Sequence, residues 1–121
     1  MDEKISPEVQ KLAAQLQQQQ QQLRNISLQK QSFSYQKVEI ENALEELKNV
    51  KENEEVFKVV GPILIKKSKE EIEKELRNTL DKIDGSLKMI EMGEEKLKES
   101  VLKNQEKVEK LLRGENTEDK K

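Results

Sequence analysis

The sequence predicts a mainly α-helical chain: a long antiparallel two-helix coiled coil, or helical hairpin, with one short central β-hairpin. Three observations support this prediction. Apolar residues recur in alternating steps of three and four over residues 5–51 and again over residues 72–112. A ten-residue apolar island, residues 56–65, separates these stretches and has Gly61 and Pro62 at its centre. The polar residues before each stretch are typical of helix starts.

Composition favours a narrow apolar seam over a globular core. Only 32% of the 121 residues are hydrophobic and 40% are charged. Disorder usually combines low hydrophobicity with high net charge and no periodicity. Here 23 basic residues nearly balance 25 acidic ones, and the period is regular. The chain is therefore expected to form a single domain over residues 1–121.

The N-terminal coiled-coil helix is predicted over residues 5–51. Ser6 can cap its first turn, and Pro7 suits the first helical position because the missing N–H would have no partner there. A glutamine run from Gln17 to Gln22 is expected to be helical, since Leu16 and Leu23 hold the heptad phase across it. The predicted seam is apolar at ten of its thirteen positions, which are Ile5, Val9, Leu12, Leu16, Gln19, Leu23, Ile26, Lys30, Phe33, Lys37, Ile40, Leu44 and Leu47.

The C-terminal coiled-coil helix is predicted over residues 69–113. Ser68 and Glu71 have the spacing of a capping box, and Gly114 is suited to ending the helix before a flexible tail at residues 114–121. Nine of its eleven seam positions are apolar: Leu76, Leu80, Ile83, Leu87, Ile90, Glu94, Leu97, Val101, Asn104, Val108 and Leu111. Folding the helices back on each other brings the polar seam residues to similar heights, Gln19 with Asn104 and Lys30 with Glu94. We expect these pairs to fix the alignment.

The central island is predicted to form a β-hairpin over residues 55–66, with strands at 55–60 and 63–66. Both faces would be largely apolar, and a lone hairpin leaves unpaired backbone at both edges. Neighbouring chains should therefore cover it. The alternative is a hydrophobic loop folded over its own helix ends. The residues expected to mediate oligomerisation are Val56, Phe57, Val59, Val60, Gly61, Ile63, Leu64 and Ile65.

This arrangement resembles a β-class prefoldin subunit of the archaeal type. The resemblance covers nearly the whole chain and is most specific at the hairpin, residues 55–67, which read EVFKVVGPILIKK. The glutamine-rich first helix, with Gln29, Lys30 and Gln31, and the segment ALEEL at 43–47 add to it. The related α-class subunits carry two hairpins and a longer insert, whereas this chain has no second hairpin.

The resemblance implies a hexamer of two α-class and four β-class subunits. Their hairpins would join in an oligomeric β-barrel that carries six coiled coils. It also implies an ATP-independent molecular chaperone that captures unfolded client proteins at the coiled-coil tips and delivers them to a cytosolic group II chaperonin.

The coiled-coil tips offer candidate client-binding residues, because seam residues near a frayed end are only half covered. Many weak apolar contacts from several arms would give avidity without a shaped pocket. The alternative is that these residues merely finish the coiled coil. The candidates are Ile5, Val9, Leu12, Leu16, Val108, Leu111 and Leu112.

Several kinds of chemistry lack the residues they need. With no histidine or cysteine and only four isolated glycines, imidazole catalysis, zinc sites and phosphate loops are not expected. We expect no enzyme activity, metal or cofactor. A net charge of −2 with no evident cationic face argues against nucleic acid. The absence of a long apolar run or a signal-like start argues against membranes and for a cytoplasmic location.

A second class of function remains open, namely a structural coiled-coil adaptor or scaffold that docks one defined partner through its hairpin. An adaptor needs a sealed rod, whereas a chaperone needs apolar ends. Homotypic assembly is compatible with either, because the island supplies strand edges without specifying their partner.

Overall fold

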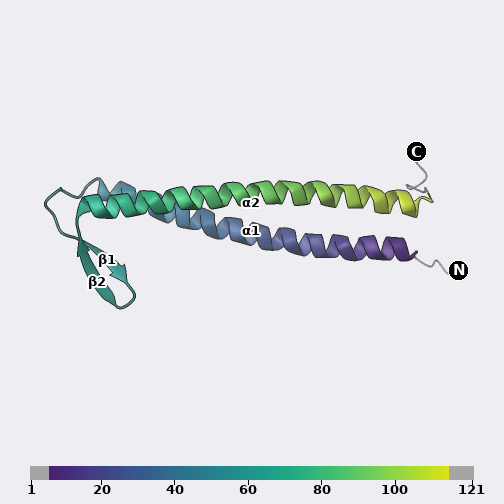
Figure 1. The fold of residues 1–121 in the computed structure, drawn as a ribbon, viewed down its shortest axis with the longest axis horizontal. Coiled ribbons are helices and arrows are strands. Elements are labelled where there is room, and N and C mark those ends of the chain that lie inside the picture. The colour runs from purple at the N-terminus through teal and green to yellow at the C-terminus, as the bar shows by residue number, and fades with distance from the viewer. Residues whose placement is uncertain (1–5, 115–121) are drawn as a thin grey trace. The chain divides into compact units, whose positions relative to one another are not determined.

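The computed structural model describes residues 6–114, and its elements follow the order helix, strand, strand, helix. These are α1 (Pro7–Leu47), β1 (Val56–Val60), β2 (Ile63–Lys67) and α2 (Lys69–Leu112) (Figure 1). The described chain divides into two compact units. The first unit contains residues 6–29 and 90–114, and the second contains residues 30–89. The predicted fold class of two long helices with a two-stranded antiparallel hairpin is confirmed.

Both helices carry the capping interactions that the sequence predicts, and α1 begins at Pro7. The Ser6 hydroxyl accepts a hydrogen bond from the Val9 N–H at 3.2 Å, which caps α1. At the start of α2, the Glu71 N–H donates to the Ser68 hydroxyl at 3.1 Å, and the Ser68 N–H donates to the Glu71 carboxylate at 3.0 Å. This reciprocal pair is the predicted capping box. The hydrogen bond from the Ser68 N–H to the Glu71 carboxylate, with a further contribution from the Ser68 side chain, holds the pKa of Glu71 below its ordinary value.

Helix ends differ slightly from the prediction. α1 ends at Leu47 rather than at residue 51, and the N–H groups of residues 48–50 bond to carbonyls three residues earlier, closing a tighter turn. Leu47 is the last seam residue of α1, so the residues beyond it have no apolar stripe to hold them helical. Gly114 has a φ of +87° and follows α2, as expected for a C-terminal cap.

In the first unit, an N-terminal part of α1 packs antiparallel to a C-terminal part of α2. Val9 and Val101 are buried. All the remaining predicted seam positions between residues 12 and 26 and between residues 90 and 111 are half-buried. The predicted pairing of Gln19 with Asn104 is confirmed. The Asn104 amide donates to the Gln19 carbonyl oxygen at 3.1 Å, and the Gln19 amide donates to the Ser100 hydroxyl at 2.8 Å.

In the second unit, the remaining parts of the helices pack around Leu47 and Ile83, both buried. The seam lysine Lys37 reaches the Asp84 carboxylate at 2.8 Å, so its charge is neutralised at the edge of the seam. The other expected polar pair, Lys30 with Glu94, would join residues of different units and stays a prediction.

The β-hairpin belongs to the second unit and has the predicted turn. β1 and β2 are antiparallel, with Val56 opposite Lys67 and Val60 opposite Ile63. Gly61 has a φ of +56°, and no other turn residue has a positive φ. A two-residue turn with a left-handed first residue and a proline second fits type II′, which glycine allows because it has no Cβ. β2 extends one residue further than predicted, to Lys67.

No helix in the described part of the chain combines the length and apolar character needed to cross a membrane.

Candidate functional site: an exposed apolar hairpin

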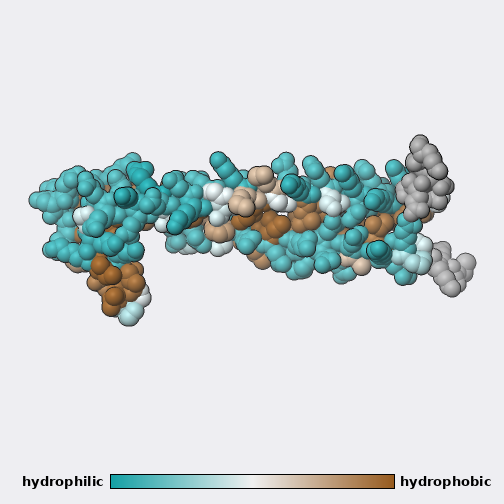
Figure 2. All heavy atoms as spheres, in the orientation of Figure 1, coloured by the Kyte–Doolittle hydropathy of each residue, from teal (hydrophilic) through white to brown (hydrophobic). Residues whose placement is uncertain are grey.

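The hairpin exposes apolar side chains on both faces. We call the face made by Phe57, Val59, Leu64 and Lys66 the outer face, and the face made by Val56, Lys58, Val60, Ile63, Ile65 and Lys67 the inner face; the strand pairing defines both. On the outer face, Val59 is 70% exposed and Leu64 is 65% exposed. On the inner face, Ile63 is still 55% exposed. Figure 2 shows the hairpin as a brown, apolar projection beside the teal surface of the adjoining helices.

A single carboxylate ties the inner face to α2. Lys58 of β1 lies 2.8 Å from one Glu75 oxygen, and Lys67 of β2 lies 2.5 Å from the other. These two hydrogen bonds lower the pKa of Glu75 to about 2, and the bond to Glu75 raises the pKa of Lys67 above its ordinary value. Because the lysines stand on the inner face, this anchoring turns the outer face away from the first turns of α2.

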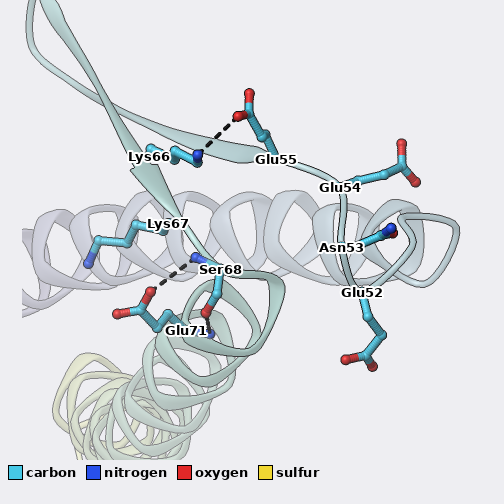
Figure 3. Close-up of a pocket in the computed structure, with 8 residues that line it drawn as sticks. All are labelled: Glu52, Asn53, Glu54, Glu55, Lys66, Lys67, Ser68 and Glu71. Carbon is cyan, nitrogen blue, oxygen red and sulfur yellow. Dashed lines mark hydrogen bonds and ion pairs between the residues drawn. The ribbon is translucent and has the colours of Figure 1, made fainter.

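A polar cleft of about 480 Å³ lies at the base of the hairpin, where the connection from α1 meets the start of α2 (Figure 3). An ion pair between Lys66 and Glu55 at 2.9 Å and the Ser68–Glu71 cap occupy its walls. The opposite wall is a charged turn in which the Lys51 N–H donates to the Glu54 carboxylate at 2.6 Å. These contacts shape the chain reversal and position the strands. The lining residues are Glu52, Asn53, Glu54, Glu55, Lys66, Lys67, Ser68 and Glu71.

The strands also present open edges. The sheet has only β1 and β2, so within the described chain each strand has one edge whose N–H and C=O groups pair with no other strand. Such edges can accept another strand by main-chain hydrogen bonding. The hairpin therefore offers two routes to a partner chain, burial of its apolar faces and strand addition at its edges. All eight residues predicted for oligomerisation lie in this hairpin.

The candidate client-binding residues that the structure describes lie in the first unit. Val9 is buried, at 7% exposure. Leu12, Leu16, Val108 and Leu111 are half-buried in the seam, and Leu112 projects from it with 66% exposure. Ile5 lies outside the described residues. A role for these residues in client binding stays a prediction.

Sequence reasoning missed Glu75. On the helix it is one glutamate among many, at a position next to the seam residue Leu76. Its significance comes from two lysines that lie on different strands and meet it only in three dimensions. The alternation of Lys58 and Lys67 onto one face of the predicted hairpin was an available signal that this face carries charge.

No group of His, Cys, Asp or Glu side chains within residues 6–114 is arranged to hold a metal ion.

Comparison with known proteins places these features in a family. Residues 10–115 match the family model described as prefoldin subunit. The chain is 39% identical over 109 residues to a prefoldin subunit beta of Archaeoglobus fulgidus, covering 90% of this chain and 94% of that protein. A prefoldin subunit beta of Pyrococcus horikoshii is 31% identical over 111 residues, covering 92% of this chain and 95% of its own length.

The fold agrees with a solved structure of the same kind. The crystal structure of the prefoldin beta subunit from Thermococcus strain KS-1 matches with a TM-score of 0.85 and 29% identity, covering 93% of this chain and 98% of that one. Two long helices, one central hairpin and sequence similarity over nine-tenths of the chain lead to one conclusion: this protein belongs to the prefoldin family of chaperone subunits and is similar to its beta subunits.

Proposed function

We propose that this chain is a β-class subunit of an ATP-independent chaperone. It assembles with α-class prefoldin subunits in a hexamer of two α-class and four β-class chains. The complex captures unfolded proteins at its coiled-coil tips and delivers them to a group II chaperonin. The observation that carries this proposal is the hairpin, which exposes apolar residues on both faces and leaves both strand edges open.

Assembly follows from the energetics of that hairpin. A two-stranded sheet is marginal in water, and burying apolar surface yields about 25 cal/mol per Å². Side chains as exposed as Val59 and Leu64 gain little in the free subunit. Hairpins of several subunits that close into a β-barrel would cover these side chains and pair the open edges.

We assign client capture to the end of the first unit at which α1 begins and α2 ends. Leu112 is exposed there, and Leu12 and Leu111 are half-buried. Several arms that each present a few such residues would hold a non-native chain through many weak contacts. This requires no pocket and no nucleotide.

One observation favours a second candidate function, a structural adaptor. Val9 and Val101 are almost fully buried, so the seam of the first unit is closed rather than open. A helix pair whose seam is buried, with one hairpin that exposes apolar residues, would suit docking to a single defined partner.

Native mass spectrometry of the complex purified from its own source would decide between these functions. The proposal expects a hexamer with four copies of this chain and two of a slightly longer subunit. A homodimer, or a complex with one unrelated protein, would favour the adaptor.

In the same experiment, Val59→Asp tests whether the hairpin is the joint between the subunits. The change places a charge on the outer face of the hairpin, where assembly would have to desolvate it. We expect loss of the hexamer. Val38→Asp is the matched control, because Val38 is also an exposed valine, at 52%, but lies on α1. A Val59→Asp complex of unchanged mass would show that the hairpin is not the joint.

A further inference from the structure

A row of lysines follows one edge of α2 in the first unit. Lys96, Lys103, Lys107 and Lys110 are separated by seven, four and three residues, the spacing that keeps side chains on one side of a helix. The first three are exposed and Lys110 is half-buried. At a rise of 1.5 Å per residue, the row is about 21 Å long.

This edge of α2 borders α1. Ser100 belongs to the same edge, four residues after Lys96 and three before Lys103, and its hydroxyl accepts the hydrogen bond from Gln19. The α1 positions that flank the seam on this side have the same heptad spacing. The first of them is Glu8, and the following ones are basic or neutral amides, namely Lys11, Gln15, Gln18, Gln22 and Asn25. We call these positions, together with the four lysines of α2, the lysine edge.

The lysine edge holds five positive charges, and one carboxylate, Glu8, lies at its α1 end beside Lys11. None of its lysines forms an ion pair with another residue of the described chain. Glu99 and Glu106 lie on the side of α2 away from the seam and moderate the potential without pairing to Lys103 or Lys110. The lysine charges are therefore available to an external anion.

The charge segregation is confined to the first unit. In the second unit the corresponding edge is mixed, since Glu39 and Glu46 of α1 lie on the same side as Lys82 of α2. Composition alone gives no sign of this segregation. Total charge hides the face because the balancing carboxylates stand on other sides of the same helix.

The residue types of the lysine edge indicate what it would bind. Lysine ammonium groups are point charges suited to carboxylates, and glutamine and asparagine amides can both donate to and accept from an extended peptide backbone. The edge has no arginine for bidentate phosphate contacts and no aromatic residue on which a base could stack. A linear row of charges matches an extended ligand rather than a compact one.

We infer that the lysine edge binds acidic segments of unfolded polypeptides, so that the complex prefers clients rich in aspartate and glutamate. This inference rests on the proposed function and specifies its substrate class. Charge attraction would draw an acidic segment along the edge, beside the apolar tip residues of the same unit. Because the edge is exposed, its contribution should fall as salt shortens the Debye length.

The test measures binding of two fluorescent unfolded peptides of equal length to the assembled complex. One peptide carries regularly spaced Asp and Glu, and in the other every acid is replaced by Asn or Gln. At low salt we expect the acidic peptide to bind about five- to tenfold more tightly, as a few exposed ion pairs allow. The preference should shrink at about 0.5 M salt.

Two triple variants locate the effect. Lys103→Gln, Lys107→Gln and Lys110→Gln together should abolish the preference, and arginine at the same three positions should retain it. The matched control replaces Lys74, Lys82 and Lys88 by glutamine. These three exposed lysines of α2 have no described partner, so the control changes net charge equally outside the lysine edge.

Three outcomes would overturn the inference. The wild-type complex could bind both peptides equally, the two glutamine variants could behave alike, or a single-stranded oligonucleotide of equal charge could bind more tightly than the acidic peptide. Suppression of aggregation of a neutral unfolded client reports the proposed function separately. If the wild type fails in that assay, capture itself is refuted; if capture persists in the lysine variant while the acidic preference is lost, the inference is supported.

Discussion

Glu75 connects two strands to one helix, and the pH dependence of that connection can be worked out. Its pKa is lowered to about 2 by the hydrogen bonds from Lys58 and Lys67. A carboxyl group whose pKa is depressed on folding stabilises the folded state fully above its ordinary pKa, here 4.5, and loses that effect as the pH falls towards 2. Lys67, whose pKa is raised, keeps its charge throughout this range.

We therefore predict that hairpin anchoring is constant from pH 7 to about 5 and weakens between about pH 4.5 and 2. Glu75→Gln should reproduce the weakened state at neutral pH. Hydrogen exchange of the hairpin amides, corrected for the intrinsic pH dependence, would measure it, with severalfold faster exchange expected in the variant. Glu70→Gln is the control, because Glu70 lies in the first turn of α2 with no described partner. Equal exchange in both variants would contradict an anchoring role for Glu75.

At the scale of the elements, the helix pair of the first unit contains a polar bridge in a mostly apolar seam. Gln19 contacts Asn104 and Ser100, and all three residues are half-buried. A polar residue in a coiled-coil seam specifies alignment at a cost in stability. Replacing only Gln19 or only Asn104 leaves the amide of the other residue half-buried without its hydrogen bond.

We predict that Gln19→Leu and Asn104→Leu each lower the stability of the helix pair by about 1 kcal/mol. The double variant should recover or exceed the wild-type stability but pair in more than one register. Thermal unfolding by circular dichroism would give the first result. Spin labels on cysteines introduced at Ala14 and Glu106 would give the second as a broadened distance distribution, and the chain's lack of native cysteine makes these labels unique. Gln18→Leu, at an exposed position, is the control. Unchanged melting and a single distance in the double variant would refute the alignment role.

The elements also show why some features were predictable. The seam followed from local spacing, because a helix places every third and fourth residue on one side regardless of its partner. The turn followed from Gly61, since a positive φ there strongly favours glycine. The end of α1 could not be predicted, because residues 48–51 contain no strong helix breaker. The helix ends at Leu47, where the apolar seam ends.

At the scale of the whole molecule, the tip residues test whether the coiled coil captures clients. Leu112 is 66% exposed and can be changed without opening the seam. We predict that Leu112→Ser reduces suppression of client aggregation by the assembled complex while leaving its mass unchanged. Leu102→Ser is the matched control, since Leu102 is 60% exposed on the same helix but ten residues further from its end.

A stronger test of client capture by the tip residues changes Val9, Leu12 and Leu111 to serine together. Client capture should weaken further and the oligomer should remain. Because Val9 is buried, circular dichroism must show that helix content persists. Unchanged aggregation suppression in both forms would remove the tips from the mechanism.

The candidate site was predictable in composition but not in orientation. The apolar island at residues 56–65 identified the hairpin, because a simple reversal between two helices rarely contains so many β-branched residues. Glu75, which orients the hairpin, could not be found this way, since its partners lie 8 and 17 residues away on other elements. The lysine edge was also missed, because it appears only when charges are sorted by heptad position.

The exposed hairpin has a consequence for how much of this protein a cell should make. A copy that finds no partner leaves Val59, Leu64 and two strand edges uncovered, which is the kind of surface that quality-control proteases and aggregation both select. We expect an orphan copy to be short-lived and a subunit in its complex to be long-lived. Synthesis of this chain would then have to keep pace with that of its partners, and excess production would raise turnover rather than chaperone capacity.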